Sequence, residues 1–432
     1  MASASVSAAS SVSDVRVRRL QALGILCGFA AGAWLGAAEA PTKLVTIGLS
    51  PMVVSLVMVW GVFLARWSLP SLIQGTGGVR NEVRKAPHLV IWAVIAGCMW
   101  TVANTLTVFA IRDIGLSIAF PLWNSNSLLG IIWGSLLFNE LRNAGLRRWI
   151  GVLCGALFMF VGAVMLALAS STQAPAGHAA RGVLAALGAG ALWGTMYIPY
   201  RKAYLSGMSP LSFITFFSFG ELGMMSVLAV IYSGGASALW LQLNGTRPVL
   251  FWLLIGGFIW VIGDLFQQYA AKYVGISRGI PLSNTNQLWG LLWGMLVFGE
   301  LKGISSSTLT QVIAGSLLMA AGAGAIALSS ATTGEHSRWQ EAAQHEAERY
   351  GIDPQYVRAH MFGEQHGEPR SGRSWVDWSL VGISCVVLIW FGSAARLPHL
   401  TLNWGWMVLL VLAMVALLIA SGTALWRLTR FT

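Results

Sequence analysis

Long apolar runs dominate the chain, and short polar stretches separate them. Runs of roughly 20 apolar residues match the length that an α-helix needs to cross about 30 Å of hydrocarbon. We expect spans at residues 20–40, 45–66, 88–111, 117–138, 149–170, 182–200, 210–232, 249–271, 277–298, 309–330, 377–395 and 402–426. The pattern predicts an all-α polytopic membrane protein, because a membrane β-barrel would instead show alternating segments of about 10 residues.

One stretch of the chain occurs twice. Residues 117–141 and 277–301 are identical at 13 of 25 positions. The identical positions include Pro121/Pro281, Asn124/Asn284, Asn126/Asn286, Gly130/Gly290, Trp133/Trp293, Gly134/Gly294 and Glu140/Glu300. Shared apolar composition would not repeat prolines, asparagines and glutamates in register, so the chain contains an internal duplication.

The duplication extends over five expected spans on each side. In the third and eighth spans, Trp100 and Asn104 align with Trp260 and Asp264. Because five is odd, the second copy must enter the membrane from the opposite side. The sequence therefore predicts a ten-helix bundle of two inverted five-helix repeats, an arrangement typical of secondary transporters with a substrate site near the midplane.

The positions of Lys and Arg predict the orientation of the bundle. With the N-terminus inside, fourteen basic residues fall in inside segments: Arg16, Arg18, Arg19, Arg66, Arg80, Arg84, Lys85, Arg142, Arg147, Arg148, Arg201, Lys202, Lys272 and Arg278. Five fall outside: Lys43, Arg112, Arg181, Arg247 and Lys302. We interpret Arg112 and Lys272, at equivalent helix ends, as snorkelling anchors, and the alternative is that they form gating ion pairs. The asymmetry favours a cytoplasmic N-terminus and a multi-pass protein of the inner (plasma) membrane.

The chain then divides into six segments. They are a cytoplasmic tail at 1–19, the first repeat at 20–170, a connecting loop at 171–181, the second repeat at 182–330, a polar linker at 331–375 and two additional spans at 376–432. The linker is rich in acidic residues and contains four of the seven His residues. Their spacing is loose and no Cys joins them, so we expect a solvated cytoplasmic helix and no metal site. The additional spans offer a surface for a homodimer.

Composition narrows the class of protein further. Hydrophobic residues make up 56% of the chain and charged residues only 10%, against about 25% charged residues in soluble domains. The net charge of +11 does not indicate nucleic-acid binding, because Lys and Arg occupy short segments between apolar runs. All four Cys residues lie inside expected spans, which argues against a disulfide framework.

The repeated residues resemble a known family. Trp100 and Trp260, the turns at 114–117 and 274–277, the Pro121/Pro281 helix starts and the Gly-rich ends at Glu140/Glu300 are similar to the drug/metabolite transporter superfamily. Within it, the chain resembles the sugar branch of glucose/ribose and rhamnose porters over roughly residues 20–330. The resemblance implies two inverted five-helix halves and proton-coupled, sodium-coupled or facilitated uptake. Residues 331–432 lie outside the ten-helix pattern. The pattern of asparagine pairs also differs from the pattern in the porters.

Several polar residues could bind a substrate inside the bundle. Amides that donate and accept hydrogen bonds suit a neutral polyhydroxylated ligand, and this predicts contacts from Asn104, Asn124, Asn126, Asn284, Asn286 and Gln287. The alternative is hydrogen bonding between helices or capping of a helix start. Trp100 and Trp260 could stack on the apolar face of a sugar, one turn from Asn104 and Asp264; the alternative is core or lipid-facing packing.

Three carboxylates lie within the ten expected spans of the repeats, namely Glu39, Glu221 and Asp264. An ionisable group in hydrocarbon is costly, so its default interpretation is functional. We predict that Glu221, Asp264 or Glu39 carries a coupling proton, and that Asp264 also accepts a hydrogen bond from substrate. The alternatives are a buried ion pair or an interfacial position. Glu140 and Glu300 lie at expected interfaces and are interpreted as structural.

Four functional hypotheses follow from these observations, and the first two are transporters that differ in their cargo. The first is a secondary transporter that moves a small neutral solute, most simply a monosaccharide, across the membrane by alternating access. The second is an exporter of amino acids, nucleosides or lipophilic metabolites with the same fold. A membrane enzyme would need a catalytic loop, and the short loops of the first ten helices offer none, so we expect no catalytic residue and no cofactor. A receptor or scaffold would use residues 331–375 and would lose its function when 331–432 are deleted.

Overall fold

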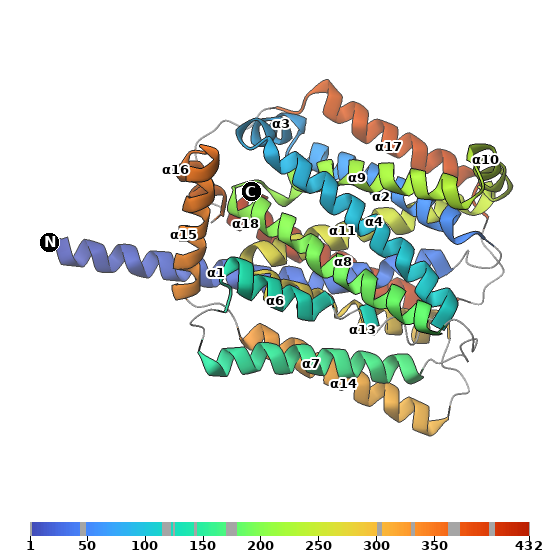
Figure 1. Ribbon diagram of the computed structural model, residues 1–432, viewed down its shortest axis with the longest axis horizontal. Helices are drawn as coiled ribbons and strands as arrows, with labels where there is room; N and C mark the ends of the chain where they lie inside the picture. The colour runs from blue at the N-terminus through green and yellow to red at the C-terminus, as the bar shows by residue number, and fades with distance from the viewer. Residues whose placement is uncertain are drawn as a thin grey trace.

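The computed structural model describes residues 2–43, 49–114, 122–123, 126–141, 145–169, 179–299, 305–329, 333–361, 372–396 and 402–431. Its regular elements are helices, and the described residues contain no strand (Figure 1). Ten described helices are long and apolar enough to cross a membrane. The expectation of an all-α polytopic membrane protein is confirmed.

The helices follow the order of the expected spans with several additions. The spanning-length helices are α1 (Ala2–Lys43), α2 (Pro51–Ile73), α4 (His88–Ile114), α7 (Leu146–Ala169), α8 (Ala179–Leu205), α9 (Pro210–Tyr232), α11 (Leu250–Val274), α14 (Ser306–Leu328), α17 (Trp375–Ser393) and α18 (Trp404–Thr429). The shorter helices are α3 (Thr76–Lys85), α6 (Asn126–Phe138), α10 (Ala236–Gly245), α12 (Ile276–Ser283), α13 (Asn286–Leu292), α15 (Thr333–Tyr350) and α16 (Pro354–Met361). Most spanning helices run lengthwise in Figure 1.

A Ser-Pro pair begins both α2 and α9. Ser50 precedes Pro51, and Ser209 precedes Pro210, with proline at the first helical position in each case. That position suits proline, because its missing N–H would have no intrahelical partner there. The hydroxyl of Ser209 also accepts a hydrogen bond from the Ser212 N–H at 3.2 Å. The shared start links the second and seventh spans, which have little else in common beyond hydrophobicity.

Glycines allow close backbone contact in two pairs of helices. A Cβ atom built at Gly61, Gly97, Gly220 or Gly257 would lie 2.0 or 2.1 Å from a carbonyl oxygen of the facing helix. Two of these glycines join α2 to α11, and the other two join α4 to α9. The same close packing therefore occurs between helices that are equivalent in the two halves of the sequence.

The ninth expected span is not one continuous helix. Helix α12 ends at Ser283, α13 begins at Asn286, and a π-helical turn follows at Trp293–Val297. The expected span at 277–298 is therefore interrupted, and Pro281 lies inside α12 rather than at a helix start. The break falls on Asn284 and Thr285, residues whose side chains compete with the helical backbone for hydrogen bonds. Broken helices of this kind occur at membrane depth where they are buried in protein.

Helices α17 and α18 pack on the outside of the bundle. Helix α17 lies along α2, and α18 lies along α1. The Trp34 indole N–H donates to the Met414 carbonyl oxygen of α18 at 3.2 Å, and the Tyr269 hydroxyl donates to the Phe431 carbonyl oxygen at 2.8 Å. The outer faces of both helices carry exposed apolar side chains, as expected for helices in contact with lipid.

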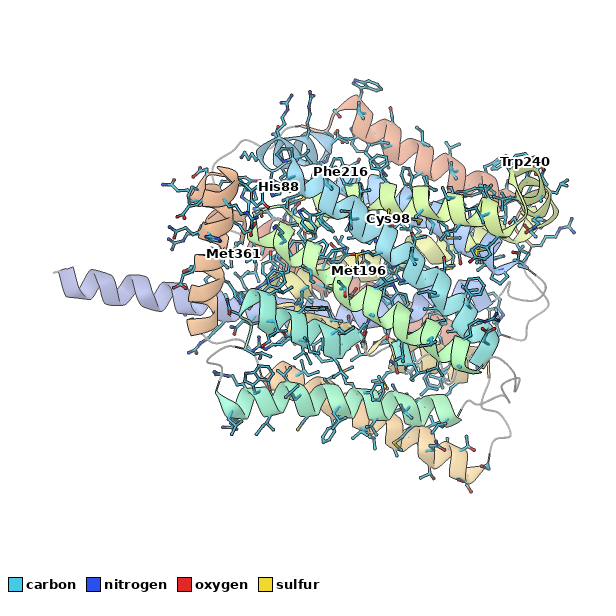
Figure 2. All side chains as sticks on the ribbon, viewed as in Figure 1. His88, Cys98, Met196, Phe216, Trp240 and Met361 are labelled. Atoms are coloured by element: carbon cyan, nitrogen blue, oxygen red, sulfur yellow. The ribbon has the colours of Figure 1, made fainter. Side chains whose placement is uncertain are left out.

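Helices α15 and α16 cross one end of the bundle, on the left in Figure 1. His88 and Met361 lie at this end, whereas Trp240 lies at the opposite end (Figure 2). The Trp339 side chain of α15 is 1% exposed, and the Tyr350 ring stacks on His88 with centroids 3.7 Å apart. The expectation of a solvated linker was therefore wrong for α15, which packs one face against the bundle.

Four cations that were assigned to loops are buried instead. Arg66 is 0% exposed, Arg201 and Arg278 are each 1% exposed, and Lys272 is 3% exposed. The interpretation of Lys272 as a snorkelling anchor was wrong, because protein rather than lipid or water surrounds its side chain. These residues do not report on orientation, so the cytoplasmic placement of the N-terminus stays a prediction that rests on the remaining basic residues.

Candidate functional site

One arginine and two carboxylates meet in the interior of the bundle. Arg66 Nη2 lies 2.9 Å from Asp264 Oδ2 and 3.4 Å from Glu221 Oε1, and all three side chains are fully buried. They come from α2, α11 and α9 respectively. We call these three residues the buried triad. Buried charges persist only when they are paired, so the triad accounts for three otherwise costly groups at once.

The two carboxylates of the triad are held differently. Asp264 Oδ2 accepts hydrogen bonds from Arg66 and from the Gln268 amide, at 2.9 and 2.8 Å. Gln268 in turn accepts the Tyr204 hydroxyl at 2.6 Å. Neither carboxylate oxygen of Glu221 accepts a hydrogen bond from a described residue. Asp264 is therefore the better stabilised anion of the pair.

Aromatic rings surround the guanidinium. The Phe217 ring lies 4.2 Å from the Arg66 Cζ atom, and the Trp260 ring lies 5.6 Å from it. Trp100 meets Trp260 edge to face, with ring centroids 5.1 Å apart. The two tryptophans that occupy equivalent positions in the repeats are therefore in contact, beside the charged groups. Charged groups and flat apolar ring surfaces therefore occur together here.

Several polar atoms around the triad have no hydrogen-bond partner among the described residues. They are Arg66 Nε and Nη1, both Glu221 carboxylate oxygens, Asp264 Oδ1 and the Tyr200 hydroxyl. Leaving a buried polar group unpaired costs about 1–3 kcal/mol. A set of both donors and acceptors without partners marks a place where a polar ligand or water would be bound.

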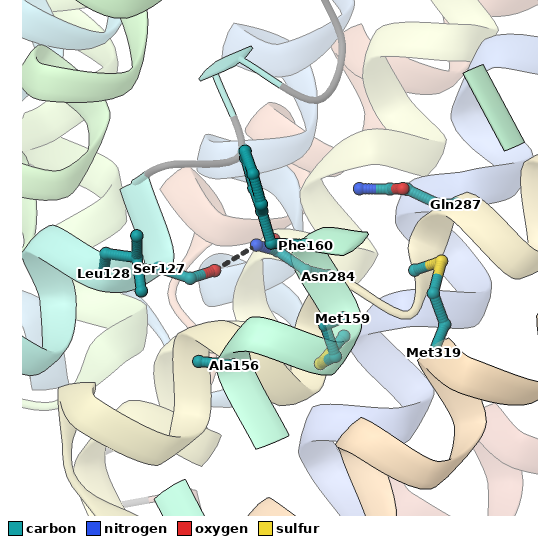
Figure 3. Close-up of a pocket in the computed structure, with 8 residues that line it drawn as sticks. All are labelled: Ser127, Leu128, Ala156, Met159, Phe160, Asn284, Gln287 and Met319. Atoms are coloured by element: carbon teal, nitrogen blue, oxygen red, sulfur yellow. Dashed lines mark hydrogen bonds between the residues drawn. The ribbon is translucent and has the colours of Figure 1, made fainter. Parts of the chain in front are cut away.

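A second group of polar side chains joins α6 to the break between α12 and α13. The Asn284 amide donates to Ser127 Oγ (Figure 3). It also donates to Asn126 Oδ1 at 3.3 Å. Ser127 and Asn284 line a pocket together with Leu128, Ala156, Met159, Phe160, Gln287 and Met319. The structure thus brings Asn126, Asn284 and Gln287 into one region, where Asn126 and Asn284 also connect the two halves of the sequence.

A hydrogen bond connects α11, the helix that carries Asp264, with this second group. The Gln267 amide of α11 donates to the Ser283 hydroxyl, directly before Asn284. Gln267 follows one turn after Asp264 on α11. Polar side chains therefore extend from Arg66 in the first repeat to Asn284 in the second.

The other expected site residues are less well connected. Asn104 is half-buried, and its backbone carbonyl accepts the Thr107 hydroxyl at 2.7 Å. Asn286 starts α13, and its side-chain oxygen has no partner among the described residues. Asn124 lies outside the described residues, as does the side chain of Glu39. No cluster of three or more His, Cys, Asp or Glu side chains suited to a metal occurs within the described part of the chain.

Sequence reasoning missed Arg66 and the tyrosines near it. Arg66 falls at the edge of an apolar run followed by basic residues, so charge placement alone assigned it to a loop. Tyr200 and Tyr204 are fully buried on α8, one turn apart, and face the triad. One signal was available in the sequence: two carboxylates inside the bundle require a cation, and Arg66 is one of the few cations at the ends of the expected spans.

Comparisons with known proteins match a family model, two relatives and a solved structure. Residues 184–347 match the model of a family described as "Sugar transport protein". Two relatives, from Listeria innocua and Listeria monocytogenes, have names that include the words "sugar uptake protein". Each is 26% identical over 234 residues, which covers 53% of this chain and 75% of the relative. A solved crystal structure aligns with 70% of this chain and 95% of its own, at 16% identity and a TM-score of 0.45.

Proposed function

We propose that this protein is a secondary transporter of a neutral monosaccharide, and that substrate binds beside the buried triad. The matched family description and the names of the two relatives support sugar as the class of cargo. The observation that carries the proposal is the triad itself, in which Glu221 and Asp264 share Arg66 within the membrane interior. Ionisable groups at this depth are typical of substrate and ion pathways.

The unpartnered atoms around the triad fit a polyhydroxylated ligand. Sugar hydroxyls both donate and accept hydrogen bonds, and the triad offers donors on Arg66 and acceptors on Glu221 and Asp264. Trp100 and Trp260 supply apolar ring surface for the C–H face of a sugar. Trp100, Trp260 and Asp264 were expected to bind substrate from the sequence, with Asn126 and Asn284 as further contacts.

Charge counting supports proton coupling. With both carboxylates ionised, the triad carries one uncompensated negative charge in a fully buried space. One bound proton makes the group neutral, which removes the cost of burying that charge. Asp264 accepts two hydrogen bonds while Glu221 accepts none from the described residues, so we assign the proton to Glu221. Glu39 is retained as a predicted third carboxylate, and sodium as the alternative ion.

Alternating access would come from the two repeats. We propose that they have opposite orientations in the inner membrane, with the N-terminus in the cytoplasm, as in the drug/metabolite transporter superfamily. The close helix pairs at Gly61/Gly257 and Gly97/Gly220 support equivalent packing of the two halves. Each repeat could then adopt the conformation of the other and expose the site to the opposite side.

Uptake by purified protein in proteoliposomes tests the proposal. We expect an imposed inward proton gradient to drive accumulation of at least one labelled monosaccharide. Glu221→Gln should bind the same sugar but lose accumulation against a gradient, since a permanently neutral side chain carries no proton. Glu341→Gln, which changes an exposed carboxylate on α15, is the matched control and should behave like the parent.

Three outcomes would contradict the proposal. Accumulation by Glu221→Gln equal to that of the parent would remove Glu221 as the proton carrier. Thermal stabilisation by amino acids or nucleosides and by no sugar would favour the exporter hypothesis, because ligands that bind the folded state raise its apparent stability. Stabilisation by none of them, with no flux, would contradict a transporter of small polar solutes.

A further inference from the structure

Glu140 lies at the end of α6 and binds the start of a helix from the other half of the chain. Its Oε1 accepts the Ile276 N–H at 3.1 Å, and its Oε2 accepts the Ser277 N–H at 2.9 Å and the Ser277 hydroxyl at 2.8 Å. These N–H groups belong to the first turn of α12, which has no intrahelical acceptor for them. A carboxylate at this place is also favoured by the helix dipole.

Two glycines make room for this carboxylate. A Cβ atom at Gly275 would lie 2.6 Å from Glu140 Oε2, and one at Gly134 would lie 2.7 Å from the same oxygen. Gly275 also has a φ of +85°, a conformation that side chains with a Cβ rarely adopt. Glycines from both halves of the sequence therefore leave the space that the Glu140 carboxylate occupies, and a single methyl group at either position would fill it.

Arg201 of α8 completes the contact. Its Nε lies 3.0 Å from Glu140 Oε1, and its Nη1 donates to the carbonyl oxygens of Ala271 and Lys272 at 3.3 and 3.1 Å. Glu140 is 0% exposed and Arg201 is 1% exposed. One buried ion pair thus ties α6 of the first repeat to α8, α11 and α12 of the second.

Helix α15 covers this ion pair from outside. The Trp339 ring lies 4.2 Å from the Arg201 Cζ atom, and Trp339 is itself 1% exposed. The neighbouring Lys202 lies 3.7 Å from Glu346 on the same helix. Arg201 is therefore held between Glu140 on one side and α15 on the other. Helix α15 lies at the left end of the bundle in Figure 1.

We infer that Glu140 is a positioning residue that locks this end of the transporter closed, and that α15 reinforces the lock through Trp339 and Arg201. The inference rests on the proposed alternating access, because opening this end requires α6 to separate from α12. When α6 separates from α12, the charges of Glu140 and Arg201 become hydrated again. This hydration offsets the loss of the ion pair, so the lock is reversible. Since α12 leads directly to Ser283 and Asn284, the lock also fixes the helix that presents these polar side chains.

Alkylation of a single cysteine at the lock tests this inference in the full-length protein. Ile276→Cys places a thiol at a 0% exposed position whose N–H binds Glu140, in a background where the four native cysteines are serine. A water-soluble maleimide should label it slowly. Glu140→Gln should raise the labelling rate about tenfold, because breaking a buried ion pair favours the open state. Trp339→Phe should raise it less, and Glu341→Gln should not change it.

A second thiol separates a lock from a merely structural contact. Cys27 is native, 0% exposed and located on α1. In a protein with Cys27 as its only cysteine, Glu140→Gln should leave the labelling rate unchanged. Equal acceleration at Cys27 and at position 276 would overturn the inference, since it would mean general loosening. An unchanged rate at position 276 would overturn it too. Neither measurement uses a sugar, so both results are independent of the proposed cargo.

Discussion

Arg66 Nη2 and Asp264 Oδ2 are 2.9 Å apart, in a fully buried ion pair that joins the second helix of one repeat to the third helix of the other. Glu221 lies 3.4 Å from the same nitrogen, so a single guanidinium pairs with carboxylates from two different helices. Stability and function are coupled at this point. The buried triad joins three helices, and it contains Glu221, the residue that we propose to exchange a proton.

Replacing Arg66 should destabilise the whole protein. Arg66→Ala leaves two buried carboxylates without a cation, and breaking a buried pair in this way costs about 3–5 kcal/mol. Arg66→Lys keeps the charge but loses the planar fork, so we expect an intermediate loss. Thermal unfolding of the detergent-purified protein measures both. Arg80→Ala, at an exposed position on α3, is the control. An unfolding temperature for Arg66→Ala equal to that of the control would contradict the role of the triad.

Shortening Trp260 should weaken substrate binding. Trp260→Phe keeps an aromatic ring but reduces the surface that faces Trp100 and Arg66. Aromatic contacts are worth about 0.5–1.5 kcal/mol beyond burial, so we expect the Kd for the transported sugar to rise about threefold to tenfold. Equilibrium binding with labelled sugar gives the value. The control is Trp240→Phe, since Trp240 is 63% exposed on α10, and this variant should bind the sugar as the parent does. The same Kd for the Trp260 and Trp240 variants would place the sugar elsewhere.

Close backbone packing predicts which helical glycines tolerate a methyl group. A Cβ at Gly257 would lie 2.0 Å from the Met58 carbonyl oxygen, so Gly257→Ala must separate α11 from α2 and should cost about 1–3 kcal/mol. Gly223 on α9 has no atom within 4 Å of such a Cβ. Gly223→Ala should be neutral or stabilising by up to about 1 kcal/mol, since alanine favours helix. Opposite shifts in unfolding temperature would support this packing, and equal shifts would contradict it.

The helical class was predictable because the lengths of the apolar runs and the internal duplication are visible in the sequence without knowledge of how the chain packs. The sequence also singled out Glu221 and Asp264, since a carboxylate within an apolar run is conspicuous without knowledge of its neighbours. The role of Arg66 was not predictable in this way. Its partners lie on helices far along the chain, and only the packing of α2 against α9 and α11 brings the three together.

Helix α15 was predictable from the spacing of its apolar residues, although not from the average composition of its segment. Residues 331–375 are polar on average, and this indicated a solvated linker. Within them, however, Trp339, Ala343 and Ala347 recur every four residues and are at most 3% exposed. This spacing forms an apolar stripe on one face of a helix, which is typical of a helix packed on one side. A search by periodicity rather than by average polarity would have found it.

Docking of α16 should weaken as pH falls. Burial lowers the pKa of His360, nearby Lys272 and Lys85 lower it further, and Glu82 together with the hydrogen bond to the Tyr356 carbonyl oxygen opposes them. His360 is therefore neutral in the docked state, while the undocked side chain takes up a proton near its ordinary pKa of about 6.5. The stabilisation is present above that pH and is lost as pH falls toward the lowered pKa.

Hydrogen exchange of the α16 amides measures this effect. After correction for the intrinsic rate, protection should fall between about pH 7.5 and pH 5.5 in the parent, a range that spans the ordinary His pKa. His360→Gln cannot gain a proton, so its protection should stay constant over the same range. His345→Gln, which changes an exposed histidine on α15, should behave as the parent does. If protection in His360→Gln falls as much as in the parent, another group controls the docking of α16.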